Sequence, residues 1–113
     1  MRKGLLVLMF AAAFASATLC QSRQTLPERR AAIDGIDARL VVLLNERARV
    51  VREIGRVKQE AGLPVSDPQR VEQVLERIAS INAGPLPAEH MRRIYETIIA
   101  EMTAFEAAEM TRK

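Results

Sequence analysis

A single apolar stripe runs along residues 28–62, a stretch that contains no proline. Its apolar positions recur mostly at steps of three, four or seven residues, which is the spacing of one face of an α-helix. These positions are Ile33, Ile36, Leu40, Leu43, Leu44, Val50, Val51, Ile54 and Val57. Thr25 and Glu28 have the spacing of a capping box, and Gly62 is typical of a left-handed helix end. The pattern therefore predicts one long amphipathic helix.

Two shorter stretches of helical spacing follow. Asp67 is a good N-cap and Pro68 a good first residue for a second helix, which the polar turn at residues 82–85 ends. A third helix is expected to open at residues 86–89. The two apolar stripes are Val71, Val74, Leu75, Ile78 and Ile81, and then Met91, Ile94, Tyr95, Ile98, Ile99, Met102 and Phe105. This spacing places Tyr95 and Phe105 in the core and not on a binding surface.

Composition and helix length together indicate the architecture. The chain of 113 residues is 49% hydrophobic but only 4% aromatic, which favours an aliphatic helical core. About 35 helical residues make a rod of roughly 50 Å, whereas a compact chain of about 100 residues is only ~26 Å across. Two shorter helices cannot cover such a stripe, so a second copy is expected to do so. The expected fold is all-α, a three-helix protomer over residues 26–110 with one very long N-terminal helix, in an intertwined helical homodimer.

The first residues have the organisation of a secretory signal. Arg2 and Lys3 give a positive start, residues 4–15 form a short apolar core, and residues 15–17 are a small-x-small cleavage signature. We expect a signal peptide at residues 1–17, with cleavage as late as residue 20, and a periplasmic or secreted protein. The apolar run is too short for a stable membrane span.

Loss of this signal also changes the charge. The net charge falls from +3 to +1, because residues 1–17 hold two cations and no acids. A nearly neutral domain without a concentrated basic block has little electrostatic reason to bind DNA or RNA. We therefore expect no nucleic-acid partner.

Cysteine and histidine are too scarce for most metal sites. Cys20 is the only cysteine, so no internal disulfide or cysteine-based site can form, and the bulky Leu19 before it disfavours lipid anchoring there. His90, the only histidine, excludes a multi-histidine site and is expected to be exposed. The chain has no glycine-rich phosphate loop. Neither a metal nor a cofactor is expected.

Cations interrupt the apolar rod at regular intervals. Arg47 and Lys58 are eleven residues apart and so share nearly the same helix face, at about 100° per residue. Arg30 is seventeen residues before Arg47 and lies roughly 100° around the rod, where it could serve another pocket. Gly55, inside the same helix, indicates close packing of another helix or a ligand. The alternative is that these cations are solvated side chains lying along the helix surface.

The polar residues on this helical frame resemble those of the all-helical chorismate mutases. The shared pattern is Arg30-x-x-Ile33-x-x-Ile36-Asp37-x-x-Leu40-x-x-Leu43-Leu44-x-x-Arg47, then Ile54-Gly55-x-x-Lys58, then Pro64-Val65-x-Asp67-x-x-Arg70. The resemblance covers residues 26–109. It implies a dimer with two active sites, each completed by an arginine from the partner subunit.

Carried over by position, the resemblance assigns a role to each polar residue. Arg30 is the arginine that crosses to the partner's site, and Arg47 and Arg70 bind the substrate carboxylates. Lys58 reaches the ether oxygen of the breaking bond, and Asp67 lies near the ring hydroxyl.

Three positions depart from the commonest family pattern. Val71 replaces an acidic residue that contacts the ring hydroxyl, and Met102 replaces a small hydroxyl residue. Glu106 stands where the family often has glutamine, and it can donate a hydrogen bond only when it is protonated. The resemblance makes Lys58 and Glu106 the catalytic pair.

The implied reaction is the Claisen rearrangement of chorismate to prephenate, a step in the synthesis of phenylalanine and tyrosine. It needs no nucleophile, metal or cofactor, in keeping with the residues that the sequence lacks. Two alternatives remain. Val71 also resembles the sister lyases that release pyruvate from isochorismate, and Val71 and Met102 together leave room for a non-catalytic exported dimer that binds a protein or a small dianion.

Overall fold

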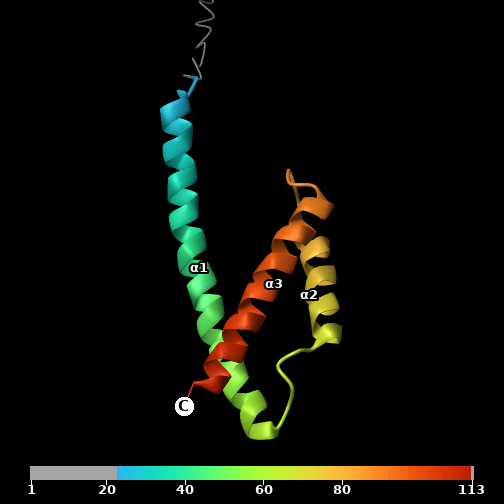
Figure 1. The fold of residues 1–113 in the computed structure, drawn as a ribbon. Helices are drawn as coiled ribbons and strands as arrows, with labels where there is room; N and C mark the ends of the chain where they lie inside the picture. The colour runs from blue at the N-terminus through green and yellow to red at the C-terminus, as the bar shows by residue number, and fades with distance from the viewer. Residues whose placement is uncertain (1–22, 113) are drawn as a thin grey trace, which may run out of the picture.

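The computed structural model describes residues 23–112, which form three helices and no strand. In Figure 1, α1 (Leu26–Ala61) is the long rod, α2 (Pro68–Ile81) is the shortest helix, and α3 (Ala88–Thr111) returns from α2 to α1. This confirms the predicted all-α protomer with one very long N-terminal helix. The predicted signal peptide and Cys20 lie outside the described residues.

Both ends of α1 have the local structure that the sequence predicts. The Glu28 backbone N–H donates to Thr25 Oγ1 at 3.4 Å, and the Thr25 N–H donates to the Glu28 carboxylate at 2.6 Å, which completes the capping box. At the other end, Gly62 has a φ of 68°, a left-handed conformation that suits glycine. Its N–H bonds to the Gln59 carbonyl oxygen at 3.3 Å, and the helix stops there.

The helix α3 holds the protomer together, because it packs against both α1 and α2 while those two helices do not pack against each other. Figure 1 shows α3 beside α2 at its N-terminal end and crossing the C-terminal half of α1 at its other end. The buried apolar residues Val74, Leu75 and Ile78 all lie on α2. The helices α1 and α2 are therefore connected through α3 and not through direct packing.

The apolar stripe of α1 remains largely exposed in the single chain. Ile33, Leu40 and Leu43 keep 56%, 49% and 58% of their surface accessible to solvent. The rod is too long for α2 and α3 to cover, as its length predicts. Within residues 23–112 no helix combines the length and the apolar character needed to cross a bilayer.

Candidate active site

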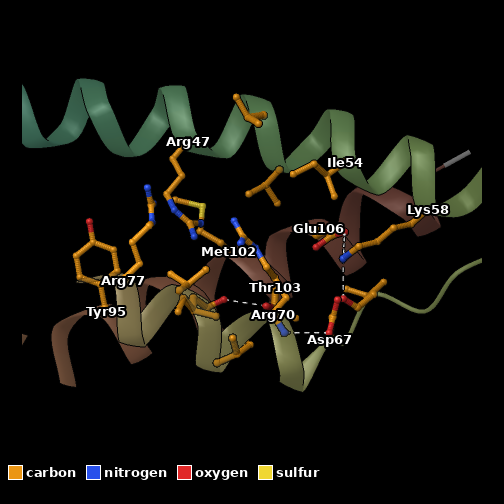
Figure 2. A pocket seen from close by; sticks show the side chains of 16 residues that line it. Arg47, Ile54, Lys58, Asp67, Arg70, Arg77, Tyr95, Met102, Thr103 and Glu106 are labelled. Carbon is orange, nitrogen blue, oxygen red and sulfur yellow. Dashed lines mark hydrogen bonds and ion pairs between the residues drawn. The ribbon is translucent and has the colours of Figure 1, made fainter. Parts of the chain in front are cut away.

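A pocket of about 650 Å³ opens between the three helices. Apolar side chains from all three helices form much of its wall, and cations from α1 and α2 extend into it (Figure 2). The residues that line it are Arg47, Val50, Val51, Ile54, Lys58, Val65, Asp67, Arg70, Val71, Val74, Arg77, Tyr95, Ile99, Met102, Thr103 and Glu106. Four of these side chains are cationic and two are carboxylates, so the lining is suited to an anion.

The structure brings together most of the residues singled out from the sequence. Arg47, Lys58, Asp67, Arg70 and Glu106 all line this pocket, although they come from three helices and a loop. Their roles toward a substrate stay predictions.

Arg30 is placed differently from the other candidates. It lies on the exposed N-terminal half of α1 and does not line the pocket of its own chain. This agrees with the angular separation from Arg47 that the sequence indicates.

Lys58 joins α1 to both other walls of the pocket. Its Nζ donates to the Val65 carbonyl oxygen at 2.8 Å and lies 2.9 Å from Glu106 Oε1. Only 19% of the side chain is accessible, so water screens the charge weakly. The ammonium group is thus held by the protein before any ligand arrives.

Glu106 is the buried charged residue of residues 23–112, with 5% of its surface accessible. Lys58 is close enough for an ion pair, but the angle is not that of a hydrogen bond, and Glu106 Oε1 has no hydrogen-bond partner. The ion pair still counts, because charge attraction depends mainly on distance. A buried oxygen without a hydrogen bond is costly, so this site favours a ligand atom that donates to it.

Gly55 makes the close approach of α3 possible, as its position in the helix predicts. A Cβ added there would lie 3.1 Å from Glu106 Cγ and 3.4 Å from Met110 Cγ. It is the buried residue of α1. The absence of a side chain therefore fixes how deep Glu106 sits beside Lys58.

We expect Gly55→Ala to lower kcat/KM of the rearrangement that the resemblance implies by about tenfold with little change in Tm, because displacing Glu106 by a fraction of an ångström would cost activity if Glu106 acts on the substrate. Alanine is more favourable than glycine in a helix by about 1 kcal/mol, which offsets part of the crowding against Glu106. Steady-state kinetics and thermal melts test this. Gly35→Ala in the same helix is the control, since nothing in its own chain lies within 4 Å of the added carbon, and light scattering checks that the variant keeps the oligomeric state of wild type. Equal activity of Gly55→Ala and wild type would show that Gly55 does not position Glu106.

Asp67 has a structural task in addition to its predicted one. Its Oδ1 accepts a hydrogen bond from the Arg70 backbone N–H at 3.1 Å and so caps α2, as the sequence predicts. The cap fixes the first turn of α2, which carries Arg70 into the pocket (Figure 2).

Three further pocket residues were not singled out as functional from the sequence. Tyr95 is half-buried and lines the pocket, so the prediction of a core position was wrong: helical spacing does not separate a pocket wall from a core. Arg77 is seven residues after Arg70, and this two-turn spacing could have indicated it. Thr103 donates its hydroxyl hydrogen to the Ile99 carbonyl at 2.8 Å. It therefore does not supply the hydroxyl donor that Met102 lacks.

The remaining predictions concern His90 and metals. His90 is exposed, as expected, and its Nδ1 lies 3.1 Å from an Arg93 nitrogen. Among residues 23–112 no group of three or more histidine, cysteine, aspartate or glutamate side chains is arranged to hold a metal ion.

A comparison with protein families shows to which family the chain belongs. The sequence pattern of the family described as chorismate mutase type II matches residues 29–107. The chain belongs to this family. The match includes every candidate site residue named from the sequence, from Arg30 to Glu106.

Sequence matches to individual proteins support the same family. The chain is 37% identical over 87 residues to the bifunctional chorismate mutase/prephenate dehydratase of Aquifex aeolicus, which covers 74% of this chain and 24% of that protein. It is 43% identical over 77 residues to the enzyme of the same name from Neisseria gonorrhoeae, covering 68% and 21%. The chain thus spans less than a quarter of these curated relatives.

A solved structure matches over nearly its whole length. The chorismate mutase of Thermus thermophilus, in its form II, superposes with a TM-score of 0.72 at 34% identity. The match covers 74% of this chain and 96% of that one. The three-helix protomer is therefore the fold of this family.

Proposed function

We propose that this protein is a chorismate mutase, which rearranges chorismate to prephenate. Membership of the family supports the reaction, and the observation that carries it is the pocket itself. There Lys58 lies 2.9 Å from the buried Glu106, and Arg47 and Arg70 extend into the same space (Figure 2). A site of fixed cations over an apolar wall suits a small dianion.

The reaction breaks a C–O bond and forms a C–C bond within one molecule, so no group is transferred to the protein. The enzyme has to hold the flexible dianion in its compact reactive conformer and to stabilise negative charge on the ether oxygen. Arg47 and Arg70 suit the first task because the planar guanidinium binds a carboxylate through two hydrogen bonds. Lys58 and a protonated Glu106 suit the second.

The active unit of the proposal is a homodimer in which Arg30 enters the partner's site. Two observations support it: the apolar stripe of α1 is exposed in one chain, and Arg30 lies outside its own chain's pocket. A second copy lying along α1 would bury the stripe and bring an arginine to the open side of the pocket. The sequence of residues 1–17 further supports export to the periplasm or the medium.

Loss of chorismate absorbance with purified protein lacking residues 1–17 tests the reaction. Turnover of chorismate supports the mutase, whereas pyruvate release from isochorismate alone would identify the lyase that Val71 also fits. Tight binding of a bicyclic dicarboxylate that mimics the transition state, without turnover of either substrate, would identify a non-catalytic binding protein.

We expect the activity to be highest at mildly acidic pH and to fall as pH rises, because only a protonated Glu106 can donate to the ether oxygen. An ionised carboxylate beside Lys58 would also repel the developing negative charge. Glu106→Gln keeps the donor at all pH values and is expected to extend activity toward neutral pH. The measurement is kcat/KM of both proteins across a pH series. Superimposable profiles would exclude this role for Glu106.

A further inference from the structure

Arg77 is the pocket cation to which neither the sequence pattern nor the resemblance assigns a task. It lies two helical turns after Arg70, and Val74 lies between them on the same face of α2. Figure 2 shows the guanidinium groups of Arg47, Arg70 and Arg77 directed into one space, with Tyr95 beside Arg77. Lys58, Glu106 and Asp67 lie at the opposite end of the pocket.

No carboxylate among residues 23–112 neutralises Arg77. The ion pairs of this part of the chain engage Arg52, Lys58, Arg92 and Arg112. The Arg77 side chain takes part in none of them and in no hydrogen bond with the described residues. Arg92 pairs with Glu72 and Glu96, but exposed arginines such as Arg39 and Arg49 also lack an acidic partner in the described residues. Arg77 differs from these two because it lines the pocket.

Arg77 is exposed and Arg47 is half-buried, so water screens the repulsion between these like charges only in part. Arg77 shares its end of the pocket with Arg47, and Met102 and Ile99 are among the apolar residues that line the same pocket. An anion bound between the two guanidinium groups removes this repulsion. The planar guanidinium groups can each donate two hydrogen bonds to such an anion.

The charge of the lining agrees with this assignment. Four cations and two carboxylates leave the pocket with a net positive charge whether Glu106 is ionised or protonated, and Arg77 supplies one of the four cations. Val71 is relevant here, because an acidic residue at that position would lower the charge by one. With valine at position 71, the pocket is more positive by one charge than it would be with an acidic residue there.

We propose that Arg77 and Arg47 together bind one substrate carboxylate at the end of the pocket remote from Lys58. Arg77 is thus a substrate-binding residue that selects dicarboxylates. The identity of the substrate and its two carboxylates rest on the proposed function, whereas the excess of cations in the pocket supports an anionic ligand by itself. Because this carboxylate is remote from the breaking bond, Arg77 contributes to binding of ground state and transition state alike, and its loss raises KM more than it lowers kcat.

The test uses the dimeric protein and the bicyclic dicarboxylate mimic, with binding measured by calorimetry. We expect Arg77→Gln to weaken binding of the mimic and to raise KM for chorismate by about tenfold or more, as for loss of a charge-assisted hydrogen bond. Arg77→Lys keeps the charge but not the planar fork and should recover part of the affinity. Arg93→Gln, which removes the same charge from an exposed position outside the pocket, should leave both values unchanged.

The two monomethyl esters of the mimic locate the contact. One ester blocks the carboxylate assigned to Arg77 and should bind wild type and Arg77→Gln equally, while the other should still distinguish them. Equal affinity of both proteins for the dicarboxylate would overturn the proposal. So would dissociation of Arg77→Gln into monomers in light scattering, which would make Arg77 an interface residue that pairs with an acid of the second copy.

These outcomes separate the proposal from the proposed function. Binding of the dicarboxylate by wild type without turnover would end the mutase assignment and leave the Arg77 comparison intact. Failure of wild type to bind the dicarboxylate would overturn both.

Discussion

Replacing Lys58 by alanine is expected to lower kcat for chorismate by a hundredfold or more. Removing one preorganised donor at the site of developing charge costs about 3 kcal/mol of transition-state stabilisation. Lys58 is such a donor, because Glu106 and the Val65 carbonyl fix its ammonium group before substrate binds. Steady-state kinetics give the loss, and circular dichroism checks that the helix content is retained.

The same contacts make a control for folding necessary. Lys58→Ala leaves Glu106 buried without its cation, which is itself destabilising. The double variant Lys58→Ala with Glu106→Gln removes that buried charge and should fold better while staying inactive. Arg56→Ala, an exposed cation on the same helix outside the pocket, is the matched control and should keep its activity. Activity near wild type in a folded Lys58→Ala protein would exclude Lys58 as the catalytic cation.

Mixing two inactive chains is expected to restore activity. Arg30→Ala and Lys58→Ala should each nearly abolish turnover as homodimers. In a mixed dimer, one site combines the intact Lys58 of one chain with the intact Arg30 of the other, while the second site lacks both. Random exchange of equal amounts should therefore recover about a quarter of the wild-type activity, as expected for two sites in a symmetric dimer.

Two further mixtures make the result specific. Chains that both carry Lys58→Ala, differently tagged, should stay inactive after exchange, which excludes reactivation by handling. Arg47→Ala mixed with Lys58→Ala should also stay inactive, because both residues line the pocket of their own chain and every site lacks one of them. Verified mixed dimers of Arg30→Ala and Lys58→Ala without activity would refute the partner-supplied arginine.

The sequence predicts much of this structure because several signals agree locally. Thr25, Gly62 and Asp67 mark helix ends through hydrogen bonds and backbone conformations that depend on neighbouring residues only. Arg47 and Lys58 share a helix face, and the structure places both in one pocket. Such features follow from the period of a single helix and need no knowledge of tertiary packing.

The features that the sequence analysis missed depend on how helices pack. Tyr95 has the spacing of a core residue, but α1 and α2 diverge around α3, so that part of the stripe faces the pocket. Arg77 is charged and exposed, and its place in the pocket depends on the position of α2 relative to α1, which the sequence pattern does not give. The direction in which a stripe faces is a property of the assembled helices.

Gly55, Glu106 and Lys58 meet where α1 crosses α3, and the same atoms both join the helices and form the wall of the pocket. A hydrophobic replacement of the Lys58 and Glu106 pair would be expected to raise stability at the expense of rate. Stability and rate are thus opposed at this crossing, so stabilising substitutions that preserve the activity are expected elsewhere on the chain.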